Sequence, residues 1–397
     1  EKPIRRELLL KSGDLYSQEK IFLSKKHIFE TGLFSSVNIR TTDIDTSGKT
    51  LDLVVDVREL DMRYLGLKLG FGQDRGISSG SEPYTSLSMD GEWLHRNVAG
   101  RGSRLSTKLG LSLNMGNILQ RPKTEAEILY IEPWLFGFRS STSFRLKFNN
   151  QILGKEEMTS YGGDVSLIYQ PDKRFMIRTG MEIKQIFYTD IISGTRRDTL
   201  SRENERAFML NIRRDYRDNF LFPTRGTVFT LTGKLVGTVL GGTQDYYKFE
   251  TSFSHYFPLF RRVIFAYRGK IGYMGTFRKS DDTPPYEKFY LGGGTSLRGW
   301  GECKLVDEAR NVKVLTSAEI RFPLFWILGG EIFIDGGNLS SDISSLFRKT
   351  YRWDAGFGLT IATPLGPIRI DFAKIINPIG AESKQPYQLQ FSIPYAF

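Results

Sequence analysis

From residue 63 to the C-terminus, apolar and polar residues alternate with a period of two. In RLSTKLGLSLN at 104–114, four leucines and a threonine occupy the odd positions, whereas Arg104 and Lys108 share the even positions with small polar residues. Successive side chains of a strand point to opposite faces of a sheet, so such a segment has one apolar and one polar face. Residues 138–149 and 263–271 repeat the pattern. One face suits lipid and the other suits water.

The connections between these segments favour a barrel over a soluble sandwich, which would also alternate. Sixteen segments begin near residues 63, 84, 104, 123, 138, 159, 174, 206, 226, 245, 262, 313, 328, 351, 366 and 386. Beyond the first pair, every second link is short and carries a proline, at Pro133, Pro171, Pro223, Pro258, Pro323 and Pro364. Short turns at one rim, long loops at the other and an even strand number are typical of an outer-membrane barrel. We therefore predict an all-β transmembrane barrel of 16 antiparallel strands at 61–397.

Composition agrees with a barrel that has a polar interior. Aromatic residues make up 13% of the chain, there are 40 glycines, and the apolar fraction is only 40%. No run of eighteen apolar residues is found, and the nearest candidate, at 322–334, is shorter and carries Glu331. A transmembrane helix is thus not expected.

In the first sixty residues, acidic and basic residues are equal in number. The net charge of +11 therefore lies entirely in the rest of the chain. A basic domain can bind nucleic acid, but here the basic residues are dispersed along alternating strands, so no nucleic-acid partner is expected. The single cysteine, Cys303, excludes an internal disulfide and a thiolate zinc cluster. No signal peptide is visible at residue 1, and we expect that upstream sequence has been removed.

The first sixty residues predict a small helix-strand-strand module. Residues 17–31 have apolar side chains at helical spacing, with a serine at the expected cap and Gly32 just past the end. Two alternating stretches follow at 34–41 and 51–59, separated by a polar turn. The balanced charge of this module suggests a face exposed to water.

The last strand, QLQFSIPYAF, ends the chain on an aromatic residue. Its apolar residues all share one face, and the terminal Phe397 would lie in the aromatic girdle at the membrane interface. Pro394 has no N–H for the ladder, which would weaken pairing where this strand should meet the first. A harmless kink at the edge is the alternative.

The segment YLGGGTSLRGW at 290–300 resembles a phosphate-binding loop at first sight. A Walker loop closes on Gly-Lys-Ser/Thr and opens a helix, but this segment closes on Leu297-Arg298-Gly299-Trp300 and an alternating stretch follows. Counting strands places it in the external link between strands eleven and twelve. A solvated loop is possible there, but the low charge and the large aromatic favour a loop folded back into the lumen.

An arginine inside the lumen needs an acceptor, because a charge removed from water without a partner is costly. The parity of the neighbouring strands points Glu319 and Asp335 inward. The planar guanidinium of Arg298 suits bidentate pairing with such carboxylates. In the competing interpretation, the two carboxylates balance the other lumen cations one by one.

Several segments together resemble the BamA/TamA superfamily of outer-membrane assembly factors. They are YEKFYLGGGTSLRGW, SAEIRFPLF, IFIDGGN, TPLGPIRIDFA and, as a turn, DYRDNFLFPTRG. The module at 1–60, with LFSSVNIR after its helix, is similar to a POTRA domain lacking its first strand. The resemblance covers nearly the whole chain. Trp300 departs from the family, where Phe or Tyr is usual. The link that carries the motif corresponds to loop six of the family and is short after the motif.

The resemblance implies that loop six is anchored inside the barrel through Arg298, against Glu319 and Asp335. It also implies a weak seam between the first and last strands, through which client strands enter the membrane, while the POTRA module receives clients by edge-strand addition. The motif residues are Gly292, Gly293, Leu297, Arg298, Gly299 and Trp300. The seam residues are Leu65, Leu67, Leu69, Leu389, Phe391, Ile393 and Pro394.

The function implied is that of an insertase that folds β-barrel clients, without cofactor or nucleotide, in the outer membrane of a Gram-negative-type bacterium with the POTRA module in the periplasm. Its partners would be unfolded clients, the lipid bilayer and accessory periplasmic or lipoprotein subunits. A two-partner secretion pore is the main alternative, and the POTRA module disfavours a simple diffusion channel. An enzyme is not expected, since His27, His95 and His255 accompany no nucleophile or metal-ligand pattern. The BamA-like and TamA-like branches are not separated by the sequence.

Overall fold

The computed structural model describes residues 1–45, 47–74, 84–116, 122–135, 137, 140–153, 156–192, 195–278, 280, 282–306, 310–346, 348–363, 366–380, 382 and 386–392. Across these residues, none of the helices has both the length and the apolar character needed to span a membrane.

The N-terminal module packs helices on a two-stranded sheet. It contains α1 (Lys2–Arg5), α2 (Gln18–Glu30), β1 (Phe34–Asp45) and β2 (Thr50–Glu59). Ser17 caps α2 by accepting a hydrogen bond from the Lys20 amide at 3.3 Å. A small apolar core joins Ile28 of α2 to Val37 of β1. The predicted helix and strand pair are confirmed, whereas the short α1 was not predicted.

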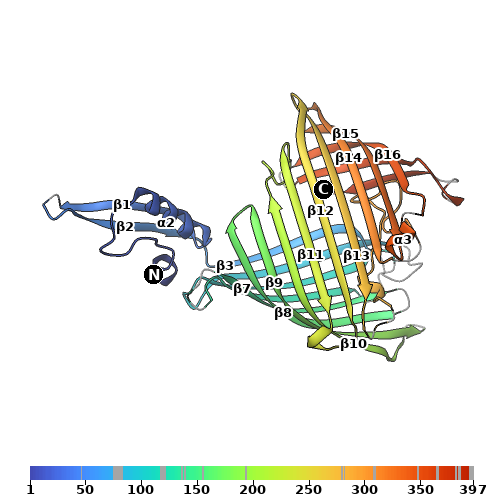
Figure 1. Ribbon diagram of the computed structural model, residues 1–397, viewed down its shortest axis with the longest axis horizontal. Helices are drawn as coiled ribbons and strands as arrows, with labels where there is room; N and C mark the ends of the chain where they lie inside the picture. Colours follow the sequence, from blue (N-terminus) through green and yellow to red (C-terminus); the bar gives the residue numbers. More distant parts are fainter. Residues whose placement is uncertain are drawn as a thin grey trace.

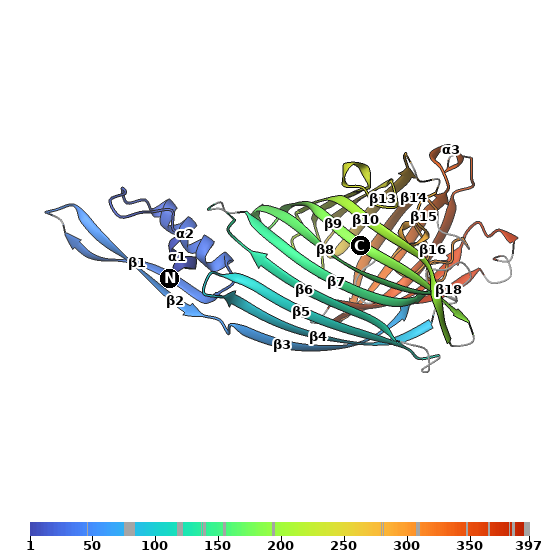
Figure 2. The same ribbon diagram turned by 90° about the horizontal axis from the view of Figure 1, so that it is seen from below.

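The remaining strands form one antiparallel sheet of 16 strands in sequence order, which confirms the predicted barrel (Figures 1 and 2). The strands are β3 (Arg63–Asp74), β4 (Tyr84–Val98), β5 (Ser103–Asn114), β6 (Lys123–Glu132), β7 (Ser141–Leu153), β8 (Glu156–Asp172), β9 (Phe175–Ile192), β10 (Thr195–Asp215), β11 (Gly226–Val236), β12 (Tyr246–Phe260), β13 (Val263–Thr276), β14 (Val312–Phe325), β15 (Leu328–Ser340), β16 (Arg352–Thr363), β17 (Gly366–Ile375) and β18 (Tyr387–Ser392). Short helices, η1 (Thr238–Leu240), η2 (Pro285–Glu287) and α3 (Ile343–Leu346), lie in the links.

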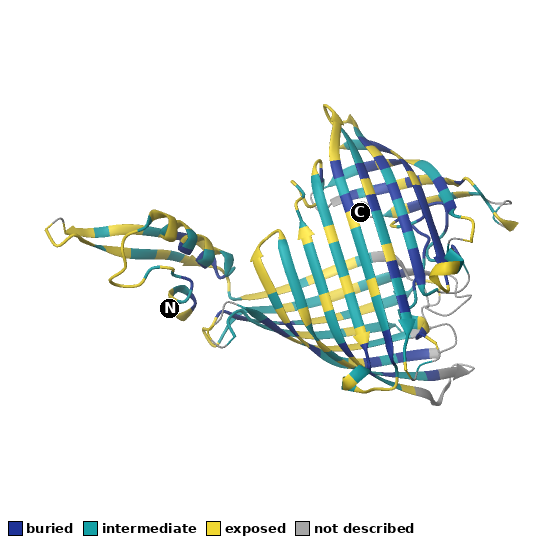
Figure 3. Cartoon of the chain, viewed as in Figure 1, coloured by how far each residue is buried: buried dark blue, intermediate teal, exposed yellow. Residues whose placement is uncertain are grey.

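The two faces of the barrel wall differ in burial. In β15, Ile332 and Ile334 are exposed on the outer face, whereas Glu331 and Asp335 are buried on the inner face. Buried residues gather in the strands around β14 and β15, while β8–β11 carry mainly intermediate and exposed residues (Figure 3). Among the described residues, the lumen is therefore filled most densely on the side of β14 and β15.

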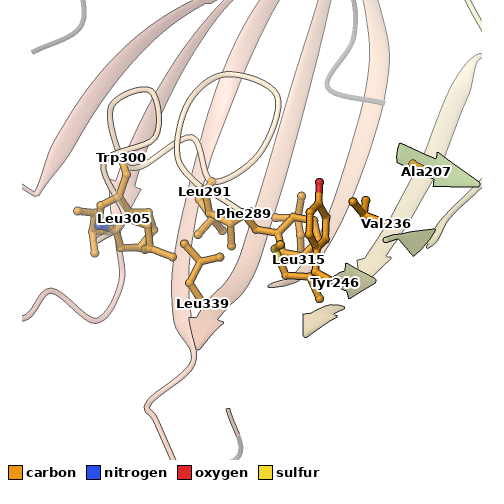
Figure 4. Close-up of a cluster of buried hydrophobic side chains, with 12 residues drawn as sticks. Ala207, Val236, Tyr246, Phe289, Leu291, Trp300, Leu305, Leu315 and Leu339 are labelled. Carbon is orange, nitrogen blue, oxygen red and sulfur yellow. The ribbon is translucent and has the colours of Figure 1, made fainter. Parts of the chain in front are cut away.

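Loop six, residues 277–311 between β13 and β14, supplies part of this filling. A β-bridge between Phe289 and Arg310 and a backbone hydrogen bond from Leu305 to Leu291 join its two limbs. Its apolar side chains pack on the inward residues of the wall, where Leu291 and Phe289 lie near Leu315 and Leu339 (Figure 4). This cluster excludes water from one side of the loop.

The first and last strands form the two ends of the sheet order. β3 pairs with β4 over twelve consecutive residues, from Arg63 to Asp74, and among the described residues β18 pairs with β17 from Tyr387 to Ser392. No ladder joins β3 to β18 within the described ranges. Within those ranges β18 therefore has one paired neighbour, β17.

Candidate functional site

The turn at residues 292–301 of loop six is built on glycines. The Gly293 amide donates to the carbonyls of Leu297 and Trp300, which closes a compact turn. Gly292 has a φ of +115°, and a Cβ there would lie 2.4 Å from the Gly301 carbonyl oxygen. At Gly299, a Cβ would lie 2.7 Å from the Asp354 Cβ of β16. Glycine therefore lets the turn form and approach the barrel wall.

Arg298 projects from this turn into a group of carboxylates and is completely buried, with 0% exposure. Its Nε donates to Asp335 Oδ2 at 2.7 Å and a terminal nitrogen donates to Asp335 Oδ1 at 2.9 Å, so the pair is bidentate. The other terminal nitrogen lies 2.8 Å from Glu319 Oε1 and 3.0 Å from Glu331 Oε1. The guanidinium carbon also lies 3.4 Å from the centre of the Phe333 ring. Every side of the fork has a partner.

Two further arginines balance the same carboxylates. Arg369 of β17 is fully buried and its Nε lies 2.8 Å from Asp371 Oδ2 and 3.6 Å from Glu331 Oε1. Arg321 of β14 donates to Glu319 Oε2 at 2.8 Å. In such a network, removing one charge leaves the others buried and unpaired, which costs about 3–5 kcal/mol. The cluster thus locks loop six to strands β14, β15 and β17.

The backbone carbonyls of the turn accept hydrogen bonds from β17 and β18, the last two strands of the sheet. Gln390 of β18 donates to the Trp300 carbonyl at 2.8 Å and to the Arg298 carbonyl at 3.4 Å. Arg369 of β17 donates to the Gly294 carbonyl at 2.7 Å. The indole nitrogen of Trp300 donates to Glu382 Oε1 at 2.9 Å. Loop six therefore contacts β18 directly through a buried carboxamide.

The residues singled out from the sequence fall into two places. The structure brings Arg298 together with Glu319 and Asp335, and it buries Leu297 and Trp300 in the apolar cluster of the loop. The seam residues that are described lie on the outer face of the end strands and are exposed. They are Leu65, Leu67, Leu69, Leu389 and Phe391. Ile393, Pro394 and Phe397 lie outside the described residues.

Sequence reasoning missed several residues that contact the turn or its carboxylates, among them Glu331, Arg369, Asp371 and Gln390. Glu331 shares the inward parity of Asp335, but parity alone does not make it a direct partner of Arg298. Arg369 and Asp371 share an inward parity in the quoted segment TPLGPIRIDFA, and that parity could have found them. Gln390 alternates with Leu389 and Phe391, so its inward direction was also readable from the strand pattern.

A comparison with known proteins shows which family this chain belongs to. The model of the Omp85 superfamily domain matches residues 97–397, which is more than half of the chain. The chain belongs to the Omp85 superfamily. A POTRA model, described as a surface antigen variable number repeat, matches residues 1–60. As an Omp85 protein, it is an outer-membrane protein whose POTRA module lies on the periplasmic side.

Individual Omp85 relatives have low sequence identity to this chain. The outer membrane protein assembly factor BamA of Neisseria meningitidis is 22% identical over 99% of this chain and 54% of its own length. The chloroplastic outer envelope protein 80 of Arabidopsis thaliana is 26% identical over 93% of this chain and 51% of its own length. The chain thus spans about half the length of these curated relatives.

Solved structures share the fold at low identity. BamA from Haemophilus ducreyi lacking POTRA domains 1–3 superposes with a TM-score of 0.77 at 19% identity, over 98% of this chain and 80% of that one. CdiB from Acinetobacter baumannii gives a TM-score of 0.64 at 13% identity, over 98% of this chain and 70% of that one.

Proposed function

We propose that this chain is an outer-membrane protein assembly factor that folds and inserts β-barrel clients through a seam between β3 and β18. The observation that carries the proposal is the place of β18 at one end of the sheet order, with no ladder to β3 within the described residues and with its inward Gln390 bound to loop six. The names of the BamA relatives support the assembly role. In this proposal residues 1–60 act as a periplasmic module and residues 61–397 as the barrel.

The physical basis is the cost of unpaired backbone groups in lipid. Each unsatisfied N–H or C=O in the hydrocarbon region costs several kcal/mol, so a strand edge there binds any incoming strand that can pair with it. β3 and β18 stand at the two ends of the sheet order, and within the described residues the outer edge of each pairs with no other strand. A client strand that pairs with the β3 edge would satisfy groups that β18 leaves unpaired.

Loop six holds the seam strand in this mechanism. The Arg298 cluster fixes the turn, and the turn accepts hydrogen bonds from Gln390 of β18 and Arg369 of β17. The lumen side of β18 is therefore positioned by the loop. Undocking of the loop would release β18 and widen the seam.

The experiment that tests the function is depletion of the protein from its native cell, followed by quantification of folded, heat-modifiable barrels in the outer membrane. We expect loss across many barrels. Unchanged barrels would contradict the proposal. A matched strain complemented with the intact gene controls for indirect effects of depletion.

A two-partner secretion pore is the second candidate, because the CdiB structures share this fold. Such a pore would pass one dedicated client to the cell exterior. Depletion would then remove a single secreted polypeptide while membrane barrels remained folded. Loss of a small subset of barrels would instead indicate a specialised assembly factor of the TamA-like kind.

A further inference from the structure

A basic cavity lies where the POTRA module meets the rim of the barrel. Its volume is about 580 Å³, within the range of small-ligand sites. It is lined by Lys2, Arg5, Arg6, Arg101, Glu132 and Trp134. The first three come from α1 and the residue after it, Glu132 is the last residue of β6, and Arg101 and Trp134 come from the links that follow β4 and β6.

The cavity lies on the outer face of the barrel wall. In β6, the lipid-facing positions are Ile128 and Tyr130, and Glu132 continues the same parity to the end of the strand. Trp134 follows two residues later at the rim. Tyrosine and tryptophan gather at the level of lipid headgroups, since their rings are apolar and their tips are polar. The cavity is therefore at the height of the periplasmic headgroups.

The POTRA segment is held against this rim by specific contacts. The Trp134 indole donates to Glu7 Oε1 at 2.6 Å, and the Arg6 guanidinium lies 5.7 Å from the centre of the Trp134 ring. Gly102 has a φ of +75°, and a Cβ there would lie 2.8 Å from a terminal nitrogen of Arg6. The site is thus built by contacts that fix Arg6 beside the barrel.

The cations of the cavity are not fully balanced by its acids. Within the described residues, no ion pair is formed by Lys2 or Arg101. Burial lowers the pKa of Arg6, although Glu7 and Glu132 act to raise it. The Nε atom of Arg6 is buried and has no hydrogen-bond partner.

The acids near the cavity already have hydrogen-bond or ion-pair partners. Glu132 Oε2 accepts hydrogen bonds from Ser103 at 2.7 Å and from Tyr130 at 2.9 Å. Glu1 pairs with Arg5 at 2.6 Å, and Glu7 accepts from Trp134. The Arg6 Nε lies 3.8 Å from Glu7 Oε1, which is too long for a hydrogen bond but close enough for an ion pair, so Glu7 balances part of the Arg6 charge. Within the described residues Lys2 and Arg101 pair with no acid and remain available to an anion that enters from the membrane.

We propose that this cavity binds the phosphate of an anionic phospholipid from the periplasmic leaflet, with Arg6 and Arg101 as the main ligands. Guanidinium groups match phosphate oxygens in shape and charge. The glycerol and acyl chains would extend along the outer face toward Tyr130 and Ile128. The lipid would thereby tie α1 to the rim and set the angle of the POTRA module. The inference needs the outer-membrane location only, and it stands whether or not the chain is an assembly factor.

The test is lipid binding by the purified full chain in a neutral detergent, measured by native mass spectrometry or calorimetry. The probes are short-chain phosphatidylglycerol, phosphatidylcholine of the same chain length, and inorganic phosphate. We expect phosphatidylglycerol to bind more tightly than both others. The double variant Arg6→Gln/Arg101→Gln should weaken its binding about 30-fold, since each basic residue near an anionic headgroup contributes about fivefold.

The matched control is Lys25→Gln/Arg225→Gln, which removes the same charge from two exposed positions, one on α2 and one in another turn. This control should leave binding unchanged. The single variant Lys2→Gln, at an exposed residue, should weaken binding about fivefold without affecting folding. Equal losses in the control would show diffuse attraction to a basic protein and overturn the site. Equal binding of phosphatidylcholine, or of inorganic phosphate, would also overturn it.

Discussion

Replacement of Arg298 by leucine tests whether the buried charge cluster holds loop six inside the barrel. Leucine keeps part of the packing on Phe333 but leaves Asp335 without its bidentate partner. Loss of one member of a buried ion pair costs about 3–5 kcal/mol. Arg369 remains close to Glu331 and Asp371 and offsets part of this. We therefore expect about 3 kcal/mol, or about a 100-fold shift toward the undocked loop.

The native Cys303 provides the assay without any added label site. It lies in the same loop, three residues after Trp300, and is half-buried. Its rate of modification by a small water-soluble maleimide reports how often the loop leaves the wall. Arg298→Leu should raise this rate by up to about 100-fold, limited by the rate of a freely exposed thiol.

Two control variants sharpen the measurement. Arg298→Lys keeps the charge but loses the fork, so its rate should rise less, by about 10-fold. Arg225→Leu removes an exposed arginine from the turn between β10 and β11 and should leave the rate unchanged. If Arg298→Leu were labelled at the rate of the unaltered protein, the charge cluster would not be what holds the loop.

Three other changes probe the same site. Reversal of the pair, Arg298→Glu with Asp335→Arg, should restore part of the docking lost in Arg298→Glu alone, as read from the Cys303 labelling rate; an absence of rescue would argue against direct pairing. Gly299→Ala should increase labelling about 10-fold, because its Cβ would lie 2.7 Å from that of Asp354 and overpacking costs about 1–3 kcal/mol. Gln390→Leu removes the two hydrogen bonds to loop six and should speed amide hydrogen exchange in β18, whereas Gln388→Leu, at a half-buried position of the same strand, should not; equal exchange in the two variants would contradict the role of Gln390.

The strands of the barrel could be predicted because their signal is local. Alternation such as that of residues 104–114 shows directly which side chains face lipid, and the same parity pointed Glu319 and Asp335 inward. The position of β7 shows the limit of this method, since the strand begins at Ser141 and not near 138. Strand ends depend on turns, for which the sequence signal is weaker.

The contacts between loop six and the end strands could not be predicted, because they join residues far apart in the chain. Arg369 is separated from Gly294 by 75 residues and Gln390 from Arg298 by 92. Parity gives the direction of such side chains but not the depth to which a loop enters the lumen. The short α1 was missed for a different reason, since its four residues are too few to show helical periodicity.

A covalent lock across the two end strands tests the central claim most directly. Leu67→Cys and Leu389→Cys, in a Cys303→Ser background, would be joined by a short bifunctional maleimide, and folding of a client barrel would be followed in liposomes that contain the protein. The control pair, Asn211→Cys and Thr232→Cys, joins opposed residues of β10 and β11 inside the sheet. We expect the lock between β3 and β18 to stop client folding while the control lock leaves it unchanged. Client folding at the full rate with the end strands joined would contradict the seam mechanism.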